Sequence, residues 1–373
     1  MQLHLDDDQS IFVDTTRRYL ADTSDIATIR ALAETERGFD ADWWARGAEL
    51  GWTSLLAPER MGGGGVSDDA VSDLALIAFE RGRLIAPGPF ASVNAVVAAL
   101  ATSDAHDDLL ARLIAGTSVA TLAASERGVR WPGPGVTTSL STVGDAVEIT
   151  GEKITVESAA VAEAFVVLAA GPEGDRLVVV PADADGVEIA PRRSPDLVRR
   201  FADVTFRDVR IGRDAVLELE RSDLERVLDI ATVLQLAETV GVLDRVLEFT
   251  IEWASDRYSF GRPLSSYQEL KHRFADMTLW LEASKATVTE AAAAVTKQPE
   301  QAGQYVSAAA SYVHEHGPEL VQDCVQMHGG IGVTWEHDIH LYLRRVTLNS
   351  LTCGTVADHR ERLASMILEG AGR

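Results

Sequence analysis

Cysteine, basic residues and long apolar runs are all scarce in this chain of 373 residues. Its two cysteines, Cys324 and Cys353, exclude a disulfide framework and cannot by themselves build a four-ligand zinc site. Lysine and arginine number 34 against 57 aspartate and glutamate residues, which gives a formal net charge of −23. Because such a chain would repel a phosphate backbone, we expect no nucleic-acid binding, and an anionic ligand would need a local basic patch.

Long apolar segments and targeting signals are also absent from the sequence. No run of about 18 apolar residues suggests a membrane span. The N-terminus reads MQLHLDDDQS and lacks the basic and apolar regions of a signal peptide. We therefore expect a cytoplasmic protein. With 46% hydrophobic and 24% charged residues, the composition is that of a globular protein long enough for two or three domains.

The pattern of apolar residues divides the chain into three parts. Helical spacing appears first, in residues 6–19, 40–50, 70–83 and 89–116. Short strand-like runs separated by Gly, Pro and Asp follow, at residues 119–123, 146–150, 164–169, 176–180 and 201–209. Long amphipathic helices joined by short loops come last, at residues 221–255, 265–297, 301–328 and 356–368.

This order predicts an α+β multidomain protein. We expect an N-terminal α-helical domain at residues 1–116, a middle antiparallel β-barrel or sandwich at 117–217, and a C-terminal four-helix bundle at 218–373. Four consecutive glycines at residues 62–65 predict a loop in the first part. They do not form a phosphate-binding loop, because no strand precedes them and no Lys-Ser/Thr pair follows.

One segment with candidate chemistry lies in the third part, and residues 256–277 read DRYSFGRPLSSYQELKHRFADM. Arg257 ends a predicted helix close to Phe260 and Gly261. A guanidinium beside exposed backbone suits bidentate binding of phosphate. The alternative is that Arg257 only caps the C-terminus of its helix.

A second segment, residues 326–346, reads QMHGGIGVTWEHDIHLYLRRV. Its glycines end a predicted helix and allow close approach of the backbone to a ligand. Five histidines lie between residues 314 and 340, and His337 and His340 are three positions apart. Because no carboxylate at a metal-binding spacing completes that pair, we expect no metal site.

Together, RxxFGxPLxxYQxxKHxxADM and QxxGGxG resemble the acyl-CoA dehydrogenase family. The early segment GWTSLLAPERMGGGG and the segment AETVGVLDRVLEFTIEWASDRYSFG match it as well, so the resemblance covers most of the chain. It implies FAD bound between subunits, α,β-dehydrogenation of an acyl-CoA thioester, and an electron-transfer flavoprotein as electron acceptor. In the family a positioned base removes the α-proton and the flavin takes the β-hydride.

The resemblance also implies which residues contact FAD held by a neighbouring subunit. Seven of these positions are intact, and Thr355 keeps its place in a later turn. The candidate FAD-binding residues are Arg257, Phe260, Tyr267, Gln268, Gln326, Gly329, Gly330 and Thr355.

The segments that should cover the flavin ring depart from the family pattern. Where the family has TEPxxGSD, residues 125–133 read SERGVRWPG. Where it has KxWITNGxxAD, residues 153–163 read KITVESAAVAE. Thr155 thus replaces the stacking tryptophan and Glu157 replaces a flavin-contacting threonine. A carboxylate at that place would repel reduced, anionic flavin.

Both positions that carry the family's catalytic base are also changed. Cys353 stands where the YEGTxE turn has glutamate, and Ala231 stands at the alternative position on a helix, followed by Thr232 where an arginine is frequent. Cys353 could serve as a base if the helix starting near Thr355 or His359 lowered its pKa. Otherwise it is a small apolar filler, and no catalytic residue is expected in this chain.

Three hypotheses follow from these departures. The first is a subunit without the glutamate in a heteromeric, α2β2 enzyme, as in actinobacterial breakdown of steroid side chains; a homologous partner then holds the flavin and the base. The second is a self-sufficient dehydrogenase with a relocated base, for which Glu238, Asp229 and Glu336 are candidates. The third is a flavin-free homologue that acts as a scaffold or binding protein.

Overall fold

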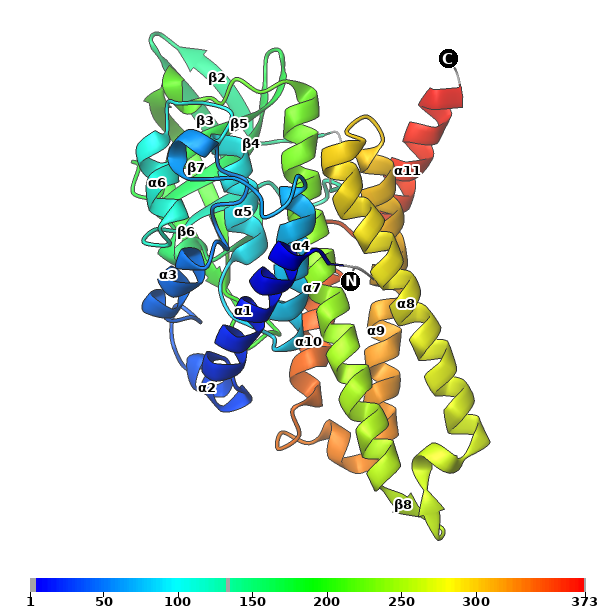
Figure 1. Cartoon of the computed structure of the whole chain (residues 1–373). Coiled ribbons are helices and arrows are strands. Elements are labelled where there is room, and N and C mark those ends of the chain that lie inside the picture. The colour runs from blue at the N-terminus through cyan, green and yellow to red at the C-terminus, as the bar shows by residue number, and fades with distance from the viewer. Residues whose placement is uncertain (1–4, 132–134, 372–373) are drawn as a thin grey trace.

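The computed structural model describes residues 5–131 and 135–371. Helices begin the chain, strands follow, and long helices end it (Figure 1). The first helices are α1 (Asp7–Thr23), α2 (Ile26–Leu32), α3 (Ala41–Glu49), α4 (Ala70–Arg83), α5 (Phe90–Leu100) and α6 (Asp107–Ile114). The predicted order of helical, β and helical regions is confirmed.

The single helix predicted over residues 89–116 is wrong, because the chain breaks it between α5 and α6. The Thr102 hydroxyl donates to the carbonyl of Ala99 (2.7 Å), and the Ser103 hydroxyl accepts from the amide of Ala105 (3.2 Å). Such local bonds between side chains and backbone compete with helix formation. The short helix α2 was not predicted.

The strands form one mixed sheet in the order β1-β4-β2-β3-β7-β6, with β5 beside β4. They are β1 (Ala120–Ala123), β2 (Ser139–Val143), β3 (Ala146–Glu157), β4 (Ala164–Gly171), β5 (Gly174–Pro181), β6 (Val187–Arg192) and β7 (Phe201–Gly212). The β2–β3, β3–β7, β4–β5 and β6–β7 pairs are antiparallel, as predicted. The β1–β4 pair is parallel, which the prediction missed. Strands β2 and β6 were missed because most of their residues are exposed or partly exposed.

The C-terminal helices are α7 (Arg221–Asp256), α8 (Gln268–Lys297), α9 (Ala302–His328), α10 (Ile339–Asn349) and α11 (Val356–Ala371). A small hairpin, β8 (Tyr258–Ser259) and β9 (Arg262–Pro263), joins α7 to α8. Figure 1 shows this hairpin at the end of the long helices that lies far from the sheet. Within the described residues, no helix has the length and apolar character that a membrane crossing requires.

One hydrophobic cluster runs through both helical regions, and a second fills the sheet. Helix α4 lies directly on α7 because two glycines permit it. A Cβ added at Gly82 would lie 1.9 Å from the carbonyl oxygen of Glu238, and one at Gly241 would lie 1.9 Å from that of Phe79. This contact places the middle of α7 between the N-terminal helices α4 and α5 and the C-terminal helix α9. The division at residues 116/117 and 217/218 remains a prediction.

Candidate functional site

The first candidate region, which we call the tip, consists of residues 257–268 and 326–333. The β8–β9 hairpin is held by two bonds. The amide of Leu264 donates to the carbonyl of Arg257 (2.8 Å), and the Tyr267 hydroxyl donates to that of Ser259 (2.7 Å). Phe260 stands at the turn with φ 49° and is 98% exposed. The hairpin therefore presents an aromatic ring to solvent.

Two arginines of the tip have free guanidinium groups. Arg257 lies over the ring of Trp253 at 5.9 Å, and Arg262 lies over that of Tyr267 at 3.8 Å. Neither has an ion-pair or hydrogen-bond partner on its guanidinium within the part of the chain that the structure describes. The backbone amide of Arg257 closes the helix by donating to Trp253, but its side chain binds no helix carbonyl. Both cations are available to an anionic ligand.

The end of α7 and the second segment of the tip meet through stacked rings. Trp253 near the end of α7 stacks on His328 at the end of α9, with ring centroids 5.3 Å apart. His328 is followed by Gly329 and Gly330, and a Cβ added at either would meet nothing within 4 Å. The backbone at these glycines is thus open to a ligand, on the same end of the bundle as Arg257.

A surface hollow of about 360 Å³ borders the tip between α8 and α9. Gln326 lines it together with Leu264, Leu270, Arg273 and Met327. Gln268 is the exposed first residue of α8. All the candidate cofactor residues except Thr355 therefore lie at this end of the molecule. Thr355 lies in the second region, where its hydroxyl donates to the Asp358 carboxylate (2.8 Å) and accepts from the Asp358 amide (3.3 Å), which caps α11.

The second candidate region, which we call the cleft, lies between the sheet, α7 and the turn at residues 349–355. Gln235 on α7 donates to the carbonyl oxygens of Asn349 (2.6 Å) and Thr352 (3.1 Å). These two bonds hold α7 against the turn that carries Cys353. Ala231, one turn earlier on α7, is buried. The two positions that the resemblance assigns to a base thus lie on α7 and on the turn that α7 contacts.

The chemistry of Cys353 in the cleft is that of a neutral thiol. Burial raises the pKa of Cys353 to about 12. His359 donates from Nε2 to the carbonyl of Cys353 (2.8 Å), and burial lowers the pKa of His359 to about 4. A neutral imidazole supplies no positive charge to stabilise a thiolate. This environment favours the filler role of Cys353 over that of a base.

The candidates for a relocated base are engaged elsewhere or remote. Glu238 binds Arg345 (2.7 Å) and Asn349 (3.1 Å); although burial opposes it, Arg345 and Arg199 hold the pKa of Glu238 below its usual range. Asp229 binds Arg362 (2.5 Å). Glu336 is exposed in the loop before α10. None of these carboxylates is free in the cleft.

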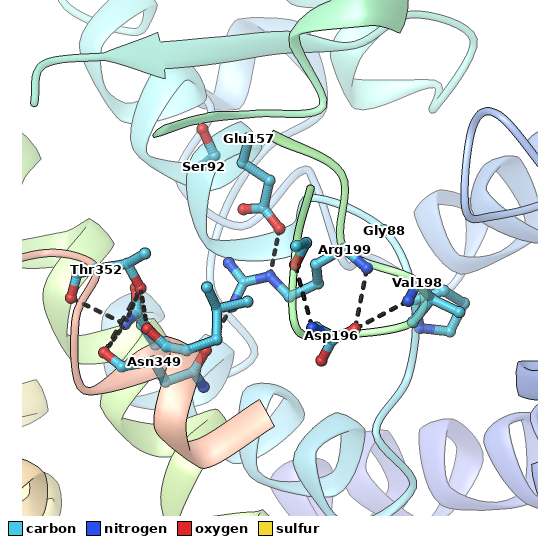
Figure 2. A network of polar contacts seen from close by, with 12 residues as sticks. Gly88, Ser92, Glu157, Asp196, Val198, Arg199, Asn349 and Thr352 are labelled. Carbon is cyan, nitrogen blue, oxygen red and sulfur yellow. Dashed lines mark hydrogen bonds and ion pairs between the residues drawn. The ribbon is translucent and has the colours of Figure 1, made fainter. Parts of the chain in front are cut away.

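Figure 2 shows the polar network that fills the cleft. Arg199 donates to Glu157 (2.6 Å) and to the side chain of Asn349 (2.6 Å). Arg345, which is fully buried, binds Asp196 (2.5 Å) as well as Glu238. Glu157, the residue in the place of a flavin-contacting threonine, is therefore neutralised by a partner from its own chain.

The segment that should cover a flavin ring packs into the cleft instead. The indole of Trp131 is buried and donates to the Thr232 hydroxyl (3.3 Å). A Cβ added at Gly354 would lie 2.8 Å from the carbonyl oxygen of Trp131. Glu126 from the same segment pairs with buried Lys153 (2.5 Å). The last two residues of the segment, 132 and 133, lie outside the described residues.

The histidines from the end of α9 to the first turn of α10 form hydrogen bonds and aromatic contacts with residues of this chain. His337 accepts from the amide of Ile339 (3.1 Å), and His340 stacks on Trp335 with centroids 4.7 Å apart. Across residues 5–131 and 135–371, no group of three or more His, Cys, Asp or Glu residues is placed to hold a metal ion.

Sequence reasoning missed the residues that fill the cleft. Arg199 belongs to the segment RRSPDLVRR, which has the composition of a solvated basic loop. Asp196 and Arg345 likewise gave no signal, because their partners lie far away in the chain. A weak signal was available at Trp131, since a tryptophan in a loop commonly finds a buried place.

The arrangement of the chain defines a class: two helical regions around a sheet, with a glycine-rich, arginine-bearing tip. The family described as acyl-CoA dehydrogenase, N-terminal domain, matches residues 6–117, and its C-terminal domain matches residues 224–368. The chain belongs to the acyl-CoA dehydrogenase family, an oxidoreductase family whose members bind FAD.

Relatives and solved structures agree with this assignment. Acyl-CoA dehydrogenase IpdE2 of Mycobacterium tuberculosis is 27% identical over 371 residues, which cover 97% of this chain and 98% of the relative. A solved structure described as a variant of the Tcur3481-Tcur3483 steroid ACAD is 27% identical, with a TM-score of 0.88 over 98% of this chain and 99% of that chain. The ChsE4-ChsE5 complex from Mycobacterium tuberculosis shares the fold at 23% identity, with a TM-score of 0.90 over 99% of both chains.

Proposed function

We propose that this chain is the subunit without a catalytic base in a heteromeric acyl-CoA dehydrogenase. A homologous partner would hold FAD and the base, and this chain would lend its tip to that FAD across the interface. The complex would dehydrogenate an acyl-CoA thioester between its α and β carbons and pass the electrons to an electron-transfer flavoprotein. Bound FAD supplies the hydride acceptor for this reaction.

The observation that carries the proposal is the free guanidinium of Arg257. Arg257 and nearby Arg262 both lack an ion-pair or hydrogen-bond partner on the guanidinium among the described residues, so two cations lie available at one end of a chain of net charge −23. Their charge suits the pyrophosphate of FAD. The open backbone at Gly329 and Gly330 lets that group approach closely, and exposed Phe260 offers a surface for the adenosine.

The filled cleft supports the division of labour. Trp131 packs against α7 and the Cys353 turn, where the family's ring-covering segments and base position converge. The tip has no covering element from its own chain among the described residues, so its ligand would arrive with another subunit. A self-sufficient enzyme would need a free base. Glu238 is paired with Arg345 and Asp229 with Arg362, so neither carboxylate supports that alternative.

The solved structures support a partner of the same family. The complex of ChsE4 with ChsE5 joins two different chains, and the Tcur3481-Tcur3483 protein is described as a steroid ACAD. By analogy, we propose an α2β2 assembly. We also propose that its substrate is a steroid whose side chain ends in a coenzyme A thioester.

The test is co-expression with a homologous partner, followed by measurement of FAD per complex from its absorbance. We expect about one FAD per pair of unlike chains, and Arg257→Ala should remove most of it because the pyrophosphate loses a charge-assisted bond. Arg213→Ala is the matched control, since this arginine donates only to the carbonyl of Gly144 in the sheet region. A colourless complex would favour the flavin-free scaffold, and a yellow, active homodimer of this chain alone would overturn the proposal.

A further inference from the structure

The cleft contains a hollow of only about 10 Å³, bordered by Arg81, Phe90, Glu157, Arg199 and Glu238. Such a volume holds about one water molecule. Sites that bind small molecules typically enclose several hundred Å³. An acyl chain therefore has no room here unless side chains move.

Two residues that border this hollow, Glu238 and Arg199, connect it to both positions that the resemblance assigns to a base. Glu238 follows Ala231 by two helical turns on α7. Arg199 binds the side chain of Asn349, and Gln235 ties α7 to the same turn that carries Cys353. A thioester that placed its α-carbon near either base position would have to occupy the space that Arg199 fills.

The loop before β7 holds Arg199 in place. Asp196 accepts from the backbone amides of Val198 (2.9 Å) and Arg199 (3.0 Å), so the turn is fixed by its own side chain. Asp196 is held in turn by Arg345 (2.5 Å) on α10. Figure 2 shows the Arg199 side chain extending from this loop toward Glu157 on one side and Asn349 on the other.

The charges around the hollow are balanced, which stabilises the closed arrangement. Arg199 pairs with Glu157 and lies 3.6 Å from Glu238, while Arg345 pairs with Glu238. Moving Arg199 outward would leave both carboxylates less compensated at a site that is mostly shielded from water. Breaking one partner of such a buried pair is strongly unfavourable, so thermal motion alone opens the cleft rarely.

A second buried cation gives the hollow its remaining polar wall. Arg81 is 1% exposed and surrounded by aromatic rings, with its guanidinium carbon 4.7 Å from the Trp52 ring centre and 4.8 Å from that of Phe90. Its Nη1 has no hydrogen-bond partner in the described structure. A wall with an unpaired buried cation suits a trapped water and opposes an apolar acyl chain.

We propose that Arg199 excludes acyl-CoA thioesters from this chain's own cleft. Given the proposed function, acyl-CoA would then enter the complex only at the partner's cleft. Arg199 would thus determine specificity by occupying the space that an acyl chain needs. Glu157 and Asp196 hold Arg199 in that position.

The test uses this chain alone, without partner or flavin, titrated with octanoyl-CoA by calorimetry. Coenzyme A is the control for binding through the nucleotide part only. The wild-type chain should show no binding of octanoyl-CoA beyond that of coenzyme A. The pair Glu157→Ala with Arg199→Ala removes both charges and opens the cleft, and it should bind octanoyl-CoA at least about tenfold tighter than coenzyme A.

The matched control is Glu157→Gln with Arg199→Met, which removes the charges but keeps the side-chain volume, and it should behave as the wild type. Saturable octanoyl-CoA binding by the wild type would overturn the proposal, as would a folded alanine pair that binds no better than the control.

Hydrogen exchange of the wild type provides a measurement that does not depend on the variants folding. The amides of Val198 and Arg199 should exchange as slowly as those inside β7, and fast exchange there would overturn the locked loop. None of these outcomes depends on FAD, so failure here is distinct from failure of the tip to hold a partner's cofactor.

Discussion

At the tip, Arg257 and Arg262 carry guanidinium groups without ion-pair partners among the described residues, whereas in the cleft Arg199 and Arg345 each lie within reach of two carboxylates. The four residues have the same side chain, so the difference lies in their surroundings. Exposed, unpaired arginines are available to a ligand from outside. Buried, paired arginines hold one arrangement of their own chain.

Both regions contain non-glycine residues with an unfavourable backbone conformation. Non-glycine residues with positive φ include Thr155, Ser158 and Cys353 in or beside the cleft and Phe260 at the tip. Such conformations cost free energy, most of all for a β-branched residue such as Thr155, and persist where the surrounding structure enforces them. The cleft therefore has an unusual backbone, including the turn that carries Cys353.

The largest effect is expected from breaking the cleft network. Arg345→Met leaves Asp196 and Glu238 buried without their main partner and should lower the free energy of unfolding by about 3–5 kcal/mol. Urea denaturation measures this change. Arg344→Met is the control, since Arg344 only donates to the carbonyl of Pro195 and stacks on Trp335, and it should cost no more than about 1 kcal/mol. Equal effects of the two variants would show that the buried network does not stabilise the chain.

Removing the indole that packs into the cleft should have a comparable but smaller effect. Trp131→Ala deletes a buried side chain and leaves a cavity, so we expect a loss of about 3 kcal/mol in the free energy of unfolding. Trp335→Ala serves as the control, because Trp335 is 57% exposed and its loss opens no buried cavity. A Trp131 variant as stable as the wild type would mean that the indole is not packed as described.

Acid should lower the stability of the folded chain, because His359 beside the cleft is buried in its neutral form. Burial lowers the pKa of His359 to about 4, so the folded chain holds this ring neutral while the unfolded chain protonates it below about pH 6.5. The contribution of His359 to the free energy of unfolding is then fully present above pH 6.5. It is lost as the pH falls, by up to about 1.4 kcal/mol per pH unit between pH 6.5 and 4. Urea midpoints across this range should decline less steeply in His359→Gln. Exposed His272→Gln is the control, and a wild-type slope that His359→Gln leaves unchanged would contradict the assignment.

The smallest effect on stability is expected at the tip. Phe260 is 98% exposed, so Phe260→Ala should change the free energy of unfolding by less than about 0.5 kcal/mol. The same variant should nevertheless lower the FAD content of the heteromeric complex. Ile11→Ala, which removes a 65% exposed side chain from α1, should change neither quantity. A Phe260 variant that retains full FAD would remove the ring from the proposed cofactor contact.

The tip was predictable from sequence because its residues form two short, contiguous segments. The long helices were also found from sequence, although the middle of α7 is buried on almost every side rather than on one face. The contents of the cleft were not predictable. Arg199 meets Glu157 and Asn349 across 42 and 150 positions of the chain, and no local pattern shows such contacts. Helix α10 was missed for a similar reason, because tertiary packing against α7 and α9 rather than strong end signals stabilises it.

The most direct test compares the two tips of the heteromeric complex. Arg257→Ala is introduced in this chain, and the corresponding arginine is changed to alanine in the homologous partner, one at a time. FAD per complex is then measured from absorbance after gel filtration. We expect the change in this chain to empty the complex and the change in the partner to leave FAD in place, because the partner's tip would face a cleft that this chain has filled. Equal loss from both variants, or loss only from the partner's, would contradict the proposed division of labour.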